Sequence, residues 1–285
     1  MQRLPARYKS FLFFVLMAAV LAFESRIVFA HSPHDIVEAL AISPNYDQDK
    51  IVFVADPTND LLKSTDGGFS WEQVVNGLDL LGPITSIVIS PDFQYDQTLF
   101  ISVKGDGVYR SQNEGGSWIK VNEGLDNLRI DLLAISANYA ADKIVLAAGS
   151  QGELYKTDNE GDSWQLVLNA HTQITAIAFF TDHEKNSILI GDQQGNLYLS
   201  IDRGRNWQQK YRFSGAGAIT SIAISPQVAD DGAIFIGTED KGVFKSADRG
   251  TSFVAVNNGI SNYKKTIFGH KEVPKSIRSL VISPN

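Results

Sequence analysis

The stretch Ser64-Thr65-Asp66-Gly67-Gly68-Phe69-Ser70-Trp71 decides the fold, because its pattern recurs four more times along the chain. The pattern is a hydroxyl residue, any residue, Asp or Asn, any residue, Gly, any residue, a small polar residue and an aromatic residue. The further copies begin at Ser111, Thr157, Ser200 and Ser246, at spacings of 43 to 47 residues. A period of this length is typical of a stack of supersecondary units.

Each position of the repeated stretch has a structural role. An Asp or Asn side-chain oxygen accepts hydrogen bonds from nearby backbone N–H groups and closes a turn, and the Gly supplies a positive φ. The aromatic residue begins the next strand and has a large apolar surface to bury against a neighbouring unit. All four tryptophans of the chain lie at this position. We assign structural roles to Asp66, Asn113, Asn159, Asp202, Asp248, Trp71, Trp118, Trp164, Trp207 and Phe253.

The residues between two copies contain further short strands. In the second unit these are 84–90, which ends before a proline, then 99–103 and 108–110. Four short strands in about 45 residues, separated by turn residues, predict one blade of a β-propeller. We therefore expect an all-β propeller of four-stranded blades. The five complete blades are expected at about 36–79, 80–126, 127–169, 170–214 and 215–260.

The chain ends on Val281-Ile282-Ser283-Pro284-Asn285, which repeats the first strand of a blade. We expect 278–285 to begin a sixth blade in a truncated form of a propeller with six or more blades. Closure of the ring with five blades is the alternative. Antiparallel pairing also predicts that the first-to-second loops lie at the same end of the blades as the repeated turns. The second-to-third turns and the links between blades then lie at the opposite end.

The first thirty residues have the pattern of a signal peptide. Arg3, Arg7 and Lys9 precede an apolar run at 11–23, and small residues end the segment at Ala30. Cleavage there removes four basic groups and one acid, so the net charge changes from −7 to −10 for residues 31–285. We expect an exported protein, periplasmic or extracellular, without membrane insertion after cleavage. The negative charge argues against nucleic-acid partners. The absence of Cys excludes disulfides and thiolate sites.

The repeated stretch resembles the Asp-box, or BNR, repeat. This repeat occurs in sialidases, xyloglucan-active glycoside hydrolases, sortilin-type receptors and photosystem II assembly factors. One box in every blade, with few insertions, is more similar to sortilin-type and photosystem II assembly factor propellers than to catalytic sialidases. The resemblance implies a propeller, but a shared fold does not determine function.

Catalytic chemistry has little support in the sequence. The sialidase resemblance implies an Arg-Ile-Pro segment, and none follows the predicted signal peptide. Glycoside hydrolysis needs two carboxylates beside the scissile bond. The second-to-third turns do carry acids, but acids are common in turns. These acids are Asp60, Asp106, Glu153, Asp192, Glu239 and Asp240. We assign no catalytic residue, no metal ligand and no cofactor.

The insertion at 259–277 is the stretch with the most function-like composition. It is basic in an otherwise acidic chain, and we assign candidate binding roles to Tyr263, Lys264, Lys265, His270 and Lys271. It would serve as a patch for an anionic partner or as a lid, and a solvated variable loop is the alternative. The sequence thus predicts an exported, non-catalytic propeller that binds or scaffolds a protein or glycan. The alternative is a glycoside hydrolase, sialidase-like or β-glucan-active, that acts on extracellular glycans.

Overall fold

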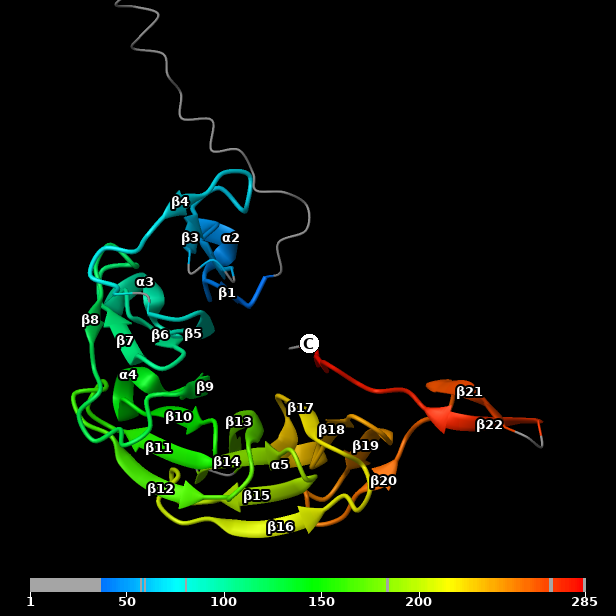
Figure 1. Ribbon diagram of the computed structural model, residues 1–285. Helices are drawn as coiled ribbons and strands as arrows, with labels where there is room; N and C mark the ends of the chain where they lie inside the picture. The colour runs from blue at the N-terminus through cyan, green and yellow to red at the C-terminus, as the bar shows by residue number, and fades with distance from the viewer. Residues whose placement is uncertain are drawn as a thin grey trace, which may run out of the picture. The chain divides into compact units, whose positions relative to one another are not determined.

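The computed structural model describes residues 37–283, except for 57, 59, 80, 183–184 and 267–268. Of residues 182, 185, 261–266 and 269–274 it describes the backbone. The predicted signal peptide, residues 1–30, and the last two residues lie outside the described part. As the sequence predicted, the fold is an all-β propeller with five four-stranded antiparallel blades in chain order (Figure 1).

The strands of each blade pair in the order in which they occur in the chain. Blade one contains β1 (Ala39–Ile42), β2 (Val52–Ala55), β3 (Leu61–Ser64) and β4 (Glu72–Gln73). Blade two contains β5 (Ile84–Ile89), β6 (Leu99–Val103), β7 (Gly107–Ser111) and β8 (Ile119–Lys120). Blade three contains β9 (Ile130–Ile135), β10 (Val145–Gly149), β11 (Glu153–Thr157) and β12 (Gln165–Asn169). Blade four contains β13 (Ile174–Asp182), β14 (Lys185–Asp192), β15 (Asn196–Ser200) and β16 (Gln208–Arg212). Blade five contains β17 (Ile219–Ile224), β18 (Ile234–Thr238), β19 (Gly242–Ser246) and β20 (Val254–Ala255).

One turn of helix follows the first strand in four of the blades, where the sequence predicted a loop. These turns are α2 (Tyr46–Asp49), α3 (Phe93–Asp96), α4 (Tyr139–Asp142) and α5 (Val228–Asp231). The last residue of each turn is an Asp whose carboxylate accepts from the Ser hydroxyl that ends the first strand, at 2.8 Å from Ser136 to Asp142. Blade four has Phe180 in place of that Ser, and there β13 and β14 continue as a direct hairpin. The Ser-to-Asp hydrogen bond thus accompanies the helical turn.

The helical turns and the Asp boxes lie at the same end of the blades, as antiparallel pairing predicted. The backbone N–H of the fourth box residue donates to the carbonyl oxygen that follows the helical turn. The distance is 3.1 Å from Glu114 N to Gln97 O and 3.0 Å from Arg249 N to Gly232 O. We call this end the box face, and the end that carries the second-to-third turns and the inter-blade links the turn face.

The hydrophobic core lies between the blades. Phe53 of blade one shares an apolar cluster with Ile101 and Trp118 of blade two. The ring of Phe100 in blade two packs edge-on against Tyr139 of blade three, with ring centroids 6.1 Å apart. Two further clusters join blade three to blade four and blade four to blade five. Each blade is therefore stabilised by burial of apolar surface against its neighbours.

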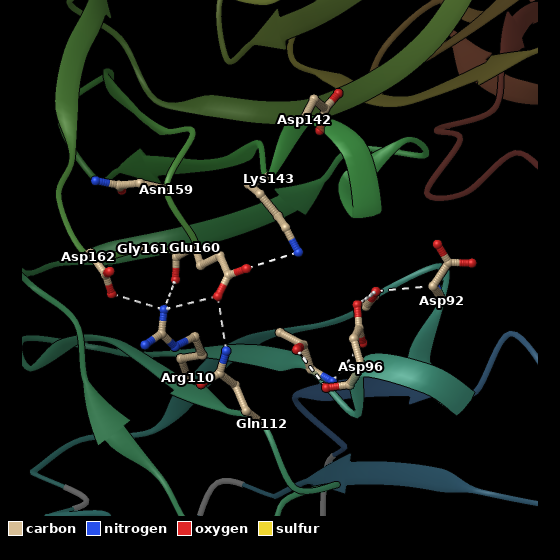
Figure 2. Close-up of polar contacts among 12 residues, drawn as sticks. Asp92, Asp96, Arg110, Gln112, Asp142, Lys143, Asn159, Glu160, Gly161 and Asp162 are labelled. Atoms are coloured by element: carbon tan, nitrogen blue, oxygen red, sulfur yellow. Dashed lines mark hydrogen bonds and ion pairs between the residues drawn. The ribbon is translucent and has the colours of Figure 1, made fainter.

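A polar clamp joins blade two to blade three at the box face (Figure 2). Arg110 on β7 donates from Nη1 to the Glu160 carbonyl oxygen at 2.6 Å and to Asp162 Oδ1 at 3.0 Å. The Glu160 carboxylate also meets Lys143 Nζ at 2.9 Å and Gln112 Nε2 at 3.0 Å. These contacts place acceptors and carboxylates at Nη1 of a largely buried guanidinium, whose Nε has no hydrogen-bond partner among the described residues.

The clamp position recurs in other blades, but not at every boundary. Lys63 in blade one meets Glu114 of the next box at 3.1 Å. Lys156 in blade three would face Arg203 in the corresponding position of the next box. It pairs with Asp158 of its own box instead, at 3.1 Å. The boundary between blades three and four therefore lacks this cross-blade ion pair among the described residues.

The box tryptophans differ in how they are held. Trp118 donates from its indole N–H to Val74 O at 2.9 Å, and Trp164 donates to Val121 O at 2.8 Å. Both acceptors belong to the preceding blade. Trp207 donates to the carbonyl of Gly204 in its own box, at 3.2 Å. Two of the box aromatics thus add a directed hydrogen bond between blades to their apolar contact.

This difference predicts unequal effects of the same substitution. Trp164→Phe should lower the free energy of unfolding by about 1–3 kcal/mol, because a buried carbonyl of blade two loses its donor. Trp207→Phe should cost less than about 1 kcal/mol, because its acceptor lies in its own turn and blade five already has Phe253 at this position. Urea unfolding followed by circular dichroism measures both. Equal losses in the two variants would contradict the assigned role of the inter-blade bond.

The segment that follows blade five contains a feature absent from the other links. Residues of the insertion pair as β21 (Ser261–Thr266) and β22 (Gly269–Pro274), a two-stranded antiparallel sheet (Figure 1). The sequence predicted a loop here. The stretch is short and mostly polar, so it has no clear alternation of apolar and polar residues that would distinguish a hairpin from an irregular insertion.

After the hairpin, Ile277 occupies the place where a sixth blade begins. The Thr220 hydroxyl donates to the Ile277 carbonyl oxygen. The equivalent bond at the start of blade three runs from the Thr85 hydroxyl to the Ile130 carbonyl oxygen, at 2.7 Å. Segment 275–283 pairs with no second strand among the described residues. The structure therefore contains five complete blades, followed by an unpaired segment at the position of the first strand of a sixth.

Candidate functional site

The Asp box is a closed network of short hydrogen bonds. Asp248 accepts from Ser252 Oγ at 2.6 Å, Ser252 N at 2.8 Å and Ser246 Oγ at 2.7 Å. Asn113 has the same place in blade two: its Oδ1 accepts from Ser117 N at 2.9 Å, and its Nδ2 donates to Ser117 Oγ at 3.0 Å. The polar atoms of the boxes are thus bonded within their own turns, which is a structural use of these residues.

The fourth box position has a backbone conformation that the sequence pattern did not reveal. It is left-handed in every box, including four non-glycine residues, with φ of 57° at Glu114, 64° at Glu160, 62° at Arg203 and 57° at Arg249. The Gly that follows is left-handed as well. Two successive left-handed residues aim several N–H groups at the Asp or Asn oxygen, so the hydrogen bonds offset the backbone strain.

The hydrogen bonds of the box change the acidity of its carboxylate. Donation from the side chain and backbone of Ser252, and then from Ser246, lowers the pKa of Asp248 from 3.8 to about 2. Hydrogen bonds from Ser70 and Ser64 likewise hold the pKa of Asp66 well below its usual value. Since the folded pKa is lower than the unfolded one, the ionised carboxylate stabilises the fold above about pH 4. This contribution is lost as the pH falls from 4 to 2.

The chain itself provides a non-titrating replacement. Asp248→Asn keeps the acceptor oxygen and adopts the arrangement already present at Asn113. At pH 7 the variant should be equally or slightly less stable than the wild type, and its relative stability should rise as the pH falls from 4 to 2. Urea midpoints measured across this range test the expectation. A difference between the two proteins that does not change with pH would refute the assigned titration.

At the turn face, the second-to-third turns of blades two to five are bonded to the link that precedes their own blade. The contacts are Lys104 N to Pro83 O, Ser150 N to Arg129 O, Gln193 N to Gln173 O and Glu239 N to Ala218 O, at 2.9 to 3.0 Å. The turns are thereby held in place by backbone hydrogen bonds. Variable side chains on a rigid frame of this kind are typical of binding surfaces.

Two adjoining hollows lie in the turn face around blade three, and they share Gln151 and Glu153. The first has a volume of about 660 Å³ and includes Asp126, Asn127, Arg129 and Tyr155. The second has a volume of about 510 Å³ and is almost entirely polar. Its other lining residues are Ser150, Asn169, His171, Thr172, Gln173 and Gln193. Amide side chains dominate this surface and present both donors and acceptors.

The carboxylates that the sequence placed on this face are mostly engaged in the frame. Asp106 is 4% exposed and accepts from Lys120 Nζ at 2.7 Å and from the Tyr109 hydroxyl. Asp192 is fully buried and accepts from Asn196 Nδ2 at 2.7 Å. These two acids have structural hydrogen-bond partners, and their burial separates them from a substrate.

The remaining acids of the turns differ in how many hydrogen bonds their carboxylates accept. Glu153 accepts from Asn127 Nδ2 and from Gln151 N, each at 3.1 Å, so both carboxylate oxygens are bonded. Asp60 accepts from Gln73 Nε2 at 2.5 Å, and Glu239 accepts from Ala218 N at 3.4 Å. Asp240, beside Glu239, has no hydrogen bond to its carboxylate in the described part of the chain. The turn acids thus range from fully bonded carboxylates, as in Glu153, to one without a bonded partner among the described residues, Asp240.

Sequence reasoning missed the amide residues that line the hollows. Asn127, Gln151, Gln173 and Gln193 stand in turns and links, where polar residues are expected for many reasons. Their separation along the chain conceals that they converge. Arg129 likewise stands in a link, directly before β9. The structure places it in the larger hollow, exposed and without a side-chain partner among the described residues.

The predicted binding residues of the insertion all lie in β21 and β22. In the strand register Tyr263 is opposite Glu272, Lys264 is opposite Lys271, and Lys265 is opposite His270. The structure describes the backbone of these residues, so their binding role stays a prediction.

Comparison with known proteins agrees with this architecture. The Sortilin-Vps10 family model, described as sortilin, neurotensin receptor 3, matches residues 106–209. A solved structure of an ancestral GH74 enzyme has a TM-score of 0.63 at 20% identity, covering 78% of this chain and 31% of that chain. The structure of YCF48 bound to D1 peptide has a TM-score of 0.57 at 16% identity, covering 85% of this chain and 75% of the other. The chain has a β-propeller fold with an Asp-box pattern in every blade.

This Asp-box propeller resembles sortilin-type and photosystem II assembly factor propellers, as the box pattern predicted. A xyloglucanase of Hypocrea jecorina (strain QM6a) is 30% identical over 89 residues, which is 31% of this chain and 10% of that enzyme. The propeller therefore spans only a small part of that relative and 31% of the GH74 chain. In the described part of the propeller no helix is long and apolar enough to cross a bilayer.

Proposed function

We propose that this protein is an exported, non-catalytic propeller that binds a protein or glycan partner at its turn face. The observation that carries the proposal is the state of the turn carboxylates: Asp106 and Asp192 are buried and bonded, and both oxygens of Glu153 are bonded. A glycosidase needs one carboxylic acid and one carboxylate that both reach the scissile bond. The engaged turn acids are better suited to hold a rigid binding surface.

The composition of the hollows supports recognition by hydrogen bonds. Gln151 lies between the two hollows, and the surrounding amide and hydroxyl groups match the hydroxyls of a glycan or the backbone of a peptide. Arg129 adds a positive charge with five donors in a fixed plane. YCF48, whose solved structure contains a D1 peptide, shares the propeller fold. Its fold supports the protein-binding version of the proposal by analogy.

The glycoside hydrolase alternative rests on the aligned xyloglucanase segment and on the GH74 fold. The larger hollow contains one exposed acid, Asp126, that has no side-chain hydrogen bond in the described part of the chain. Together with Asp240 or Glu153 it would have to supply the acid and base. Turnover of a glycan that disappears in Asp126→Asn would establish this alternative.

Arg129→Ala tests the proposed surface. With xyloglucan oligosaccharides, β-glucans, sialosides and a peptide array as probes, the wild type should bind a probe without turnover. The variant should bind that probe about tenfold more weakly, because it loses a charge-assisted donor worth about 1.4 kcal/mol. Arg205→Ala, which removes an exposed arginine from the box face, is the matched control and should bind like the wild type.

Calorimetry and product analysis on the same samples complete the test. Hydrolysis of any glycan by the wild type would refute the non-catalytic assignment. Equal losses of affinity in Arg129→Ala and Arg205→Ala would refute the assignment of the partner to the turn face.

A further inference from the structure

The β21–β22 hairpin is a two-stranded sheet whose strands pair with each other and with no blade of the described propeller. An isolated two-stranded hairpin is only marginally stable in water. Each strand has one edge whose backbone N–H and C=O groups are unpaired with any described strand. Ser261–Thr266 contains no proline, whereas β22 ends on Pro274, which cannot donate. The edge of β21 is therefore the better acceptor for another strand.

The register places two lysines, Lys264 and Lys271, opposite each other. Like-charged residues directly opposite in a sheet destabilise the pairing. The one acidic residue in the two strands, Glu272, is opposite Tyr263 and not opposite a lysine. The charge arrangement thus works against the stability of a hairpin that receives no support from a neighbouring sheet.

The charge of this segment also contrasts with that of the propeller. Residues 261–274, which form the hairpin, contain three Lys residues and one Glu, a formal charge of +2, whereas the other residues of 31–285 sum to −12. A net charge well away from zero already keeps such a protein soluble. Concentration of positive charge in one hairpin is therefore not needed for solubility, and it creates a local attraction for anionic groups.

We propose that the β21–β22 hairpin binds an extended acidic peptide segment of a partner protein as a third strand along β21. Strand addition supplies backbone hydrogen bonds to the unpaired edge, and carboxylates of the peptide neutralise the opposed lysines. A polyanionic glycan would match the charge but has no backbone N–H row to pair with the strand, so the edge favours a peptide. The inference rests on the proposed function in one respect, that the partner is a protein; its binding strand is β21, whereas the proposed turn-face surface consists of turns and links around blade three.

Lysines on an edge strand also discourage self-association. Protection against self-association and binding of an acidic strand predict different effects of Lys264→Glu. This substitution converts the like-charged pair with Lys271 into an oppositely charged pair, so amide hydrogen exchange across 261–274 should slow. Binding of an acidic strand should weaken about tenfold at the same time, because one cation is replaced by an anion. A purely protective lysine would leave no acidic-peptide binding to lose.

The test uses the full chain and fluorescence anisotropy with three probes. These are a labelled peptide of alternating Glu and Val, the same peptide with Pro at every second Val, and heparin. The wild type should bind the first probe, with affinity falling as salt rises, and should bind the Pro-containing peptide at least tenfold more weakly. Lys104→Glu with Lys210→Glu, on the propeller body, is the charge-matched control for Lys264→Glu with Lys271→Glu, and only the hairpin variant should lose binding.

Each contrary outcome overturns the proposal. Absence of binding to the Glu-Val peptide would refute the proposed site on β21. Equal affinity for the Pro-containing peptide or for heparin would mean a general polyanion patch in place of strand addition. Equal losses of peptide affinity in the body and hairpin variants would mean that the net charge of the protein alone determines binding. Arg129→Ala is measured with the same probes: unchanged binding in that variant separates the hairpin from the turn face, so failure of one site is distinguishable from failure of the other.

Discussion

The structure depends on the hydrogen bonds between the Asp or Asn oxygen of each box and the N–H groups of the turn around it. In blade five, Asp248 accepts from Ser252 and Ser246 and so holds two successive residues in the left-handed conformation. That backbone path reverses the chain between the third and fourth strands and directs the box aromatic toward the neighbouring blade. Without it, the aromatic would not reach the inter-blade core.

Repetition of one turn does not make the boundaries between blades equal. Blades one to three are joined by the Lys63 and Arg110 clamps and by the indole bonds of Trp118 and Trp164. At the boundary between blades three and four, Arg203 replaces the acidic clamp residue, and Trp207 bonds within its own box. Apolar packing therefore contributes a larger share of the stabilisation at the boundary between blades three and four. In a propeller each blade contacts its neighbours alone, so such local differences set where opening begins.

The same rigidity explains why function is sought at the turn face. At the box face, the box carboxylates and the clamp residues are bonded within turns and between blades, as Asp66 and Glu160 illustrate. The turn face is held by backbone hydrogen bonds, which leaves side chains such as Arg129 and Gln151 available for a partner. The insertion after blade five adds the β21–β22 hairpin to this frame without disturbing the position of Ile277. The proposed recognition elements are thus separate from the scaffold in the chain.

The sequence alone was enough to predict the propeller, its blade repeat and the structural roles of the box residues. These features depend on local turn chemistry and on the alternation of apolar and polar residues within short strands. The residues from Asp66 to Trp71 are close in sequence and act together within one turn. Only the tertiary structure decided which acids of the turns are buried and bonded, since Asp106 meets Lys120 and Tyr109 across strands. It also decided the convergence of Asn127, Gln151 and Gln173, which lie in different turns and links. Contacts of this kind depend on how separate strands and links pack together, and no periodicity within the chain encodes them.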